Sequence, residues 1–125
     1  MYRRRRGTAI VDTSRGILVV SALGRTYHLP GGGARRGESR KDAAIRELEE
    51  ETGLMAVDCL YLFDYSSFGN FHKVFLMKCR GTPAPRHEIR YMAYFPGSSV
   101  DVSDTTRRII EKYHEADSSR VHSGQ

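Results

Sequence analysis

Short runs of apolar residues, separated by turn-forming residues, follow one another along most of the chain, a pattern typical of β-strands. We expect six strands, at residues 4–12, 17–23, 27–29, 56–65, 72–80 and 87–95. Residues 40–52 break this pattern. They follow Ser39, which forms a capping box with Asp42, and they precede Gly53, a residue suited to ending a helix. The sequence therefore predicts a helix over residues 40–52.

A second helix is expected near the C-terminus, where Ser103 is a suitable N-terminal cap. Three residues at helical spacing form its apolar face: Ile109, Ile110 and Tyr113. Strands outnumber helices, and helices interrupt them at two places. This order predicts the α/β class, with a mixed β-sheet between helices.

The length of 125 residues suits one compact domain, which we place at residues 1–116, with a flexible polar tail at 117–125. Hydrophobic residues make up 39% of the chain and charged residues 28%, which is ordinary for a globular protein. No apolar run approaches the roughly 20 residues of a membrane span, and no signal peptide is recognisable, so we expect a cytoplasmic protein. Cys59 and Cys79 lack metal-site spacing and are expected as buried, reduced thiols.

The net charge of +5 comes almost entirely from one basic arm, Arg3–Arg6. Such an arm could bind nucleic acid, but it lacks the interleaved aromatic residues of many nucleic-acid sites, which makes this partner the less favoured one. It could also be a solvated strand edge on which charge discourages aggregation. We favour contact between one or two of these arginines and substrate phosphate, with Arg5 as the candidate.

Three glutamates of the predicted helix, Glu47, Glu50 and Glu51, share one stripe at 3.6 residues per turn. Each like-charged pair costs about 0.2–0.5 kcal/mol, and the stripe lies at the negative end of the helix dipole. A hard cation such as Mg²⁺ or Mn²⁺ would compensate these charges. The alternative is a solvated acidic face, supported by Arg46 one turn before Glu50.

A glycine run, Gly31-Gly32-Gly33, precedes this helix and is expected to form a loop. Without Cβ atoms, its backbone can approach a metal ion or a phosphate closely, so all three glycines are candidate substrate-binding residues. The alternative is an ordinary turn. The spacing fits neither the P-loop nor the dinucleotide-binding fingerprint.

The complete spacing consists of Gly32, five residues, Glu38, seven residues, and then a run from Arg46 to Leu54 that reads Arg-Glu-Leu-Glu-Glu-Glu-Thr-Gly-Leu. It resembles the box of the Nudix hydrolases, which cleave diphosphate linkages with divalent metal ions. The resemblance covers nearly the whole chain and implies an α/β/α sandwich with a mixed sheet. It also implies Mg²⁺ or Mn²⁺ as the cofactor.

The resemblance also suggests roles for individual residues. Glu47 and Glu51 would be metal ligands, Glu50 a general base or bridging ligand, and a carbonyl at Gly31 a further ligand. Glu38 and Arg46 would pair to hold the loop against the helix, with Gly53 as the structural end of the box.

Glu88 is a further catalytic candidate, because the run from Glu88 to Phe95 resembles a late strand of the family. In that strand a glutamate sometimes supports metal or base chemistry and precedes an aromatic residue, here Tyr94 where tryptophan is common. The alternative is a purely structural carboxylate.

The family resemblance implies a small phosphate-containing substrate. Our leading hypothesis is a nucleoside diphosphate derivative or a nucleoside triphosphate. Diphosphoinositol and dinucleoside polyphosphates are the alternatives within the enzyme class. A different class of function, a non-catalytic module that binds nucleotides or RNA, typically loses glutamates of the box, whereas this chain retains them. Many small Nudix proteins dimerise, which leaves a homodimer open.

Overall fold

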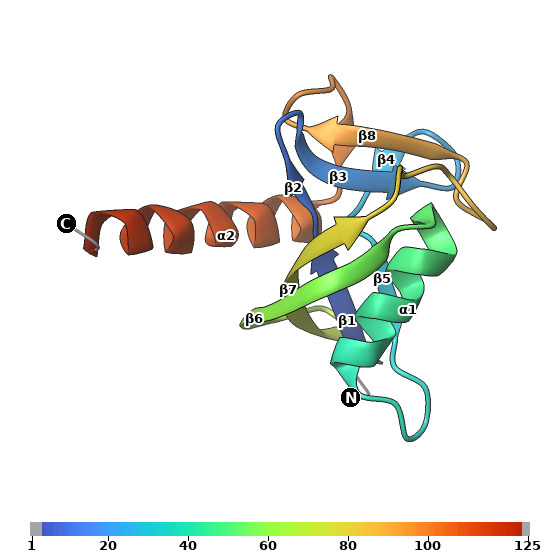
Figure 1. Ribbon diagram of the computed structural model, residues 1–125, viewed down its shortest axis with the longest axis horizontal. Coiled ribbons are helices and arrows are strands. Elements are labelled where there is room, and N and C mark those ends of the chain that lie inside the picture. The colour runs from blue at the N-terminus through green and yellow to red at the C-terminus, as the bar shows by residue number, and fades with distance from the viewer. Residues whose placement is uncertain (1–3, 124–125) are drawn as a thin grey trace.

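The computed structural model describes the backbone of residues 4–123 and the side chains of residues 4–117. Its largest sheet is mixed and has the strand order β5-β1-β7-β6. These strands are β1 (Arg4–Ile10), β5 (Gly31–Gly33), β6 (Met55–Ser67) and β7 (Asn70–Arg80). β1 runs antiparallel to β5 and parallel to β7, whereas β6 and β7 form a long antiparallel hairpin (Figure 1).

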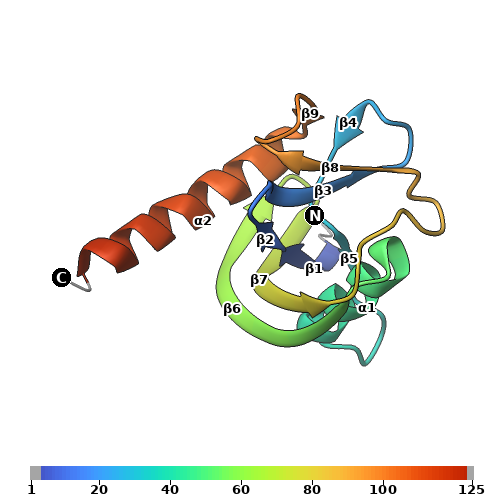
Figure 2. The same cartoon turned by 45° about the horizontal axis from the view of Figure 1, so that its top comes forward.

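The remaining strands form two smaller sheets above the mixed one (Figure 2). An antiparallel sheet has the order β2-β3-β8, built from β2 (Asp12–Thr13), β3 (Gly16–Ser21) and β8 (Tyr91–Phe95). A parallel pair joins β4 (Thr26–Tyr27) to β9 (Asp101–Val102).

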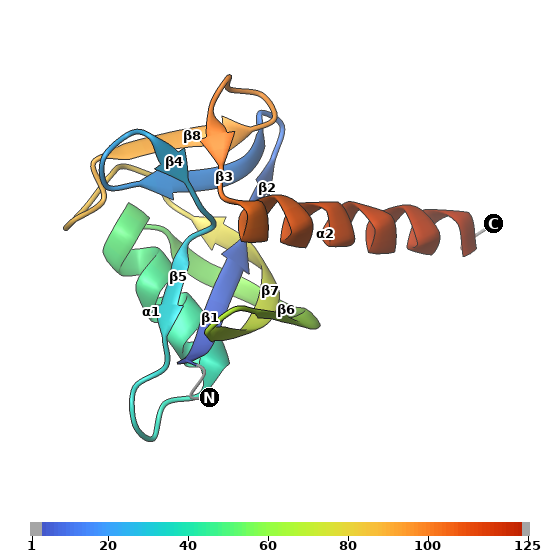
Figure 3. The ribbon, with the colours of Figure 1, turned by 180° about the vertical axis from the view of Figure 1, so that it is seen from behind.

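Two helices, α1 (Arg40–Thr52) and α2 (Asp104–Ser123), cover opposite faces of the mixed sheet. Alternation along β1 sends Ala9 into an apolar cluster with residues of α1, and sends Ile10 into a cluster with residues of α2. Seen from behind, β1 and β5 lie in front of α1, and the distal part of α2 extends away from the body (Figure 3). The expected α/β class and sandwich are confirmed. Within residues 4–123, neither helix is both long and apolar enough to cross a membrane.

Both helices begin where the sequence predicts. The Ser39 hydroxyl oxygen accepts the Asp42 N–H at 3.0 Å, and Gly53 ends α1 in the left-handed conformation with φ 78°. The Ser103 hydroxyl likewise accepts the Thr106 N–H, at 3.2 Å. α2 continues to Ser123, so the predicted tail begins within a helix, while its flexibility stays a prediction.

Two strand predictions need correction. The first predicted strand divides into β1 and β2, and the last begins at Tyr91 rather than at residue 87. His87 has a φ of 55°, and the Ile89 N–H donates to the Arg86 carbonyl, so the chain turns before β8. The free thiols of Cys59 and Cys79 are half-buried rather than buried.

Candidate metal-binding and catalytic site

The glycine run is a strand, not the loop that the sequence predicts. Gly31–Gly33 forms β5, which pairs with β1 so that Gly33 lies opposite Arg6 and Gly31 opposite Thr8. The φ of Gly31 is 152°, and a Cβ atom there would collide with the Gly7 carbonyl oxygen. A Cβ atom at Gly32 would lie 2.5 Å from the carboxyl carbon of Glu47. Because Gly32 has no side chain, the Glu47 carboxylate lies directly against the backbone of β5.

Gly7 in β1 has a similar role, which sequence reasoning missed. A Cβ atom at Gly7 would collide with the carbonyl oxygen of Arg40 and would lie 2.6 Å from the Ala44 nitrogen. The glycine thus sets how closely α1 approaches the sheet. An isolated glycine within a strand pattern is the signal that could have indicated this close approach.

Glu51 is the buried carboxylate of the site, with 7% of its surface exposed. Its Oε1 atom accepts the Gly31 N–H at 3.1 Å. Burial, together with the negative charges of Glu47 and Glu88, raises the pKa of Glu51 to about 8, although the Gly31 hydrogen bond and the Arg6 charge oppose the shift. The nearby positive charge therefore compensates the buried Glu51 carboxylate only in part.

Arg46 connects the loop before α1 to the acidic stripe. Its Nε and Nη2 atoms donate to the two carboxylate oxygens of Glu38 at 2.8 and 2.9 Å, a bidentate pair. Its Nη1 atom donates to Glu47 at 2.9 Å and to Glu50 at 3.4 Å. One guanidinium therefore contacts Glu38 and two of the three candidate ligands. The scaffold role of Arg46 and Glu38 stays a prediction.

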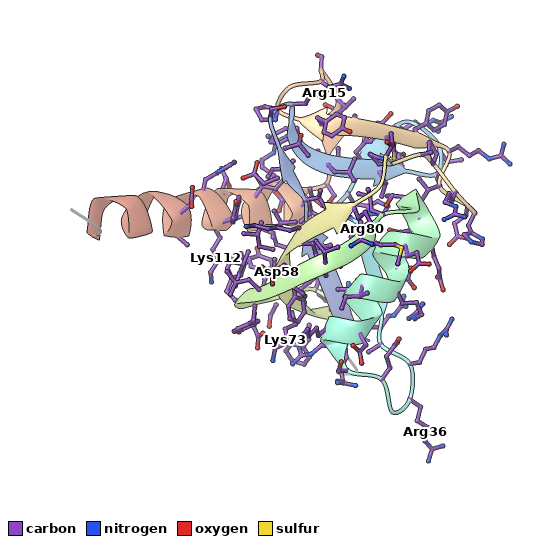
Figure 4. All side chains as sticks on the ribbon, in the orientation of Figure 1. Arg15, Arg36, Asp58, Lys73, Arg80 and Lys112 are labelled. Carbon is purple, nitrogen blue, oxygen red and sulfur yellow. The ribbon has the colours of Figure 1, made fainter. Side chains whose placement is uncertain are left out.

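Glu38 in turn closes the loop between β5 and α1. Its Oε1 atom accepts the Arg35 N–H at 2.9 Å. Hydrogen bonds from Arg46 and from this amide lower the pKa of Glu38 to about 2. Arg36 lies at the far tip of this loop and points away from the body (Figure 4).

The three carboxylates of the stripe differ in their surroundings. Glu51 is buried, Glu47 is half-buried, and Glu50 has 40% of its side chain exposed. In the part of the chain that the structure describes, no three His, Cys, Asp or Glu side chains converge as a ready group of metal ligands. Glu47 and Glu50 turn toward Arg46 instead. Their hard oxygen donors, and a buried Glu51 carboxylate that is only partly compensated, nevertheless fit a divalent cation.

Two further candidates, Glu88 and Arg5, lie outside the helix that carries the three carboxylates. Glu88 is exposed in the turn before β8, yet its charge still contributes to the raised pKa of Glu51. Arg5 is exposed, and strand alternation sends its side chain to the opposite face from Arg6. Arg3 lies outside the described residues. The roles of Glu88 and Arg5 stay predictions.

Known proteins resemble this chain in sequence and in fold. The family model described as the NUDIX domain matches residues 1–117. The chain belongs to the Nudix family. A crystal structure of a protein assigned to the Nudix hydrolase family, from Chromobacterium violaceum, matches with a TM-score of 0.83 and 38% identity, over 98% of this chain and 89% of that one. A MutT Nudix hydrolase from Burkholderia pseudomallei shares the fold, with a TM-score of 0.74 and 21% identity over 89% and 98% of the two chains.

Two curated Nudix relatives come from Arabidopsis thaliana. Nudix hydrolase 27, chloroplastic, is 39% identical over 59 residues, which are 46% of this chain and 26% of that protein. Nudix hydrolase 25 is 36% identical over 59 residues, which are 46% and 34% of the two chains. The match thus spans only about a quarter to a third of these relatives. The cytoplasmic location stays a prediction, because Nudix hydrolase 27 is chloroplastic.

Proposed function

We propose that this Nudix protein is a metal-dependent pyrophosphohydrolase, in which water attacks phosphorus in a diphosphate linkage. The substrate is a nucleoside diphosphate derivative or a nucleoside triphosphate. The main support is Glu51, a buried carboxylate held against the Gly31 amide beside a second carboxylate, Glu47. Membership of the Nudix family supports the same enzyme class.

Glu47, Glu50, Glu51 and the Gly31 carbonyl are the candidate ligands of the metal ion. When bound, a divalent ion such as Mg²⁺ or Mn²⁺ neutralises phosphate charge and lowers the pKa of water. Arg46 holds Glu47 and Glu50 in position. The side-chain-free backbone of β5 admits the phosphate groups close to these carboxylates.

Among the three carboxylates, Glu50 is the candidate to accept the proton of the attacking water. A general base must lie within hydrogen-bond reach of the water. Glu50 is the most exposed of the three and is open to water, whereas Glu51 is buried. Glu88 is the second candidate base, because its charge acts on the same site from the turn before β8.

The test is hydrolysis of a panel of nucleoside triphosphates, nucleoside diphosphate derivatives, and diphosphoinositol and dinucleoside polyphosphates, with the products separated by chromatography. Each compound is assayed with Mg²⁺, with Mn²⁺, and with excess chelator. We expect turnover only with metal ion, and its loss in Glu51→Gln. Glu49→Gln is the matched control, because Glu49 is an exposed glutamate of the same helix. Turnover that persists in chelator would refute metal dependence, and binding without turnover on any compound would favour the non-catalytic module.

A further inference from the structure

The β6–β7 hairpin carries most of the exposed large apolar side chains. Among the described residues eight such side chains are exposed, and six of them belong to this hairpin: Met55, Val57, Leu60, Tyr61, Phe68 and Phe71. The three aromatic ones lie in the segment 61–71 around the hairpin turn. Large apolar side chains that gather on one part of a surface mark an interaction site.

Sheet pairing brings the basic end of β1 to this turn. Arg5 lies opposite Phe71 in the parallel register of β1 and β7. The Arg4 N–H donates to the carbonyl of Gly69, within the turn, at 2.9 Å. The basic arm has no aromatic residues between its arginines, so the sequence of the arm alone does not predict a nucleic-acid site. The neighbouring hairpin supplies the missing rings.

Alternation along β1 and β7 directs the relevant side chains to the α1 face of the mixed sheet. Phe75 packs in an apolar cluster with residues of α1, so Phe71 and Lys73 project from the same face. A Cβ atom at Gly7 would collide with the first turn of α1, and Arg5, two residues earlier, therefore also belongs to this face. Arg5 is exposed, and Phe71 has 41% of its surface exposed.

Two cations lie beside the third ring, Tyr61. The Lys73 ammonium is 4.9 Å from the centroid of this ring, and the Arg40 charge acts on the same side chain. The ring meets Phe75 edge-on at 6.0 Å, and its hydroxyl donates to Asp64 at 3.0 Å, so its position is fixed. Within residues 4–117, neither Lys73 nor Arg40 forms an ion pair.

The combination of rings and cations restricts the partner. We define the aromatic–basic patch as three rings and three cations: Tyr61, Phe68, Phe71, Arg5, Arg40 and Lys73. Its charge favours an anionic partner. A second copy of this chain, related by a twofold axis, would place the same cations against one another, which opposes association. A duplex hides the faces of its bases, whereas a single strand offers both bases and phosphates.

We propose that the aromatic–basic patch binds single-stranded nucleic acid. Bases stack on Phe68 and Phe71. Phosphates pair with Arg5, Arg40 and Lys73. Because every base has a stacking face, the patch selects single strands over duplexes without selecting a sequence. This binding is separate from hydrolysis and does not rest on the function proposed above.

Fluorescence anisotropy with a labelled single-stranded RNA of about 12 nucleotides tests the proposal on the full chain. Excess chelator prevents metal-dependent hydrolysis of the probe. We expect the strand to bind, and we expect two unlabelled competitors to displace it at least about tenfold less well: the duplex of the same sequence, and base-free polyphosphate of equal charge. The logarithm of the affinity should fall against the logarithm of the salt concentration with a slope of about −2, from about −0.7 for each of three phosphate contacts.

Two pairs of variants separate stacking from charge. Phe68→Ala should weaken binding at least about fivefold, and because Phe68 is 86% exposed the core stays intact. Tyr91→Ala, an exposed ring on β8 outside the patch, should bind as the wild type does. Lys73→Gln should make the salt slope less negative by about 0.7. Arg80→Gln should leave the slope unchanged, because Arg80 lies at the opposite end of β7 (Figure 4).

Three results would overturn the proposal. Displacement by polyphosphate as effective as that by RNA would mean that charge alone attracts the strand. Wild-type affinity in a folded Phe68→Ala protein would exclude stacking at the patch. A wild-type dimer that dissociates in Phe68→Ala, without RNA binding, would assign the patch to a second copy of the chain. Hydrolysis is decided independently: failure of the hydrolysis panel leaves this binding intact, and failure of RNA binding leaves metal-dependent turnover intact.

Discussion

Replacing Glu51 by glutamine should stabilise the metal-free protein while it abolishes activity. The side chain is buried and its pKa is raised from 4.5 to about 8, so ionisation of Glu51 opposes folding. Because the folded state holds this proton more tightly than the unfolded state does, the free energy of unfolding falls as pH rises from 4.5 to 8. Glutamine is nearly isosteric, keeps an oxygen that can accept the Gly31 N–H, and carries no charge.

The size of the effect follows from the pKa of Glu51. One pKa unit corresponds to about 1.4 kcal/mol, and at pH 7 only the interval between 4.5 and 7 contributes. Ionisation of Glu51 therefore lowers the free energy of unfolding of the wild type by about 3 kcal/mol at pH 7. This figure is the upper limit of the gain in the free energy of unfolding in Glu51→Gln. At pH 4.5 and below, both proteins hold an uncharged side chain and should have nearly equal stability.

Urea unfolding in the presence of chelator, at pH 7 and at pH 4.5, measures this difference. In a second measurement, without chelator, manganese should raise the unfolding midpoint of the wild type more than that of Glu51→Gln. A ligand that binds only the folded state stabilises it, and Glu51→Gln lacks one candidate metal ligand. Glu49→Gln, the exposed control on the same helix, should behave as the wild type does. If Glu51→Gln were less stable than the wild type in chelator at pH 7, the reasoning from buried charge would be wrong.

Three further substitutions test the packing and electrostatics around the site. Burial lowers the pKa of His72 from 6.5 to about 4, so the free energy of unfolding of the wild type falls by up to about 3 kcal/mol as pH falls from 6.5 to 4. In His72→Gln this contribution to the pH dependence should be absent, as measured by urea unfolding. Gly7→Ala should cost about 1–3 kcal/mol by forcing α1 away from β1, and an unchanged melting temperature would contradict that contact. Arg46→Lys keeps the charge but loses the bidentate contact with Glu38, so metal-dependent turnover should fall about 10–100-fold, and turnover equal to that of the wild type would exclude a positioning role.

The sequence alone determined the features that depend on neighbouring residues. The bounds of α1 agree with the prediction because Ser39 and Gly53 act within one turn of the helix ends. The common stripe of Glu47 and Glu51 follows from helical periodicity alone. The spacing of the Nudix box is equally local, and for that reason the family and the catalytic candidates could be inferred before any tertiary contact was known.

Only the tertiary structure decided which of these groups are buried and what they face. Three glycines have no intrinsic preference for a strand, and Gly31–Gly33 becomes β5 because β1 offers it hydrogen-bond partners. Arg5 and Arg6 are chemically identical, yet sheet pairing leaves Arg5 exposed and half-buries Arg6, whose charge acts on Glu51. The pKa of a carboxylate or an imidazole depends on desolvation and on charges brought near by folding. These influences come from segments far apart along the chain, so the sequence pattern could name Glu51 as a candidate but could not reveal its burial.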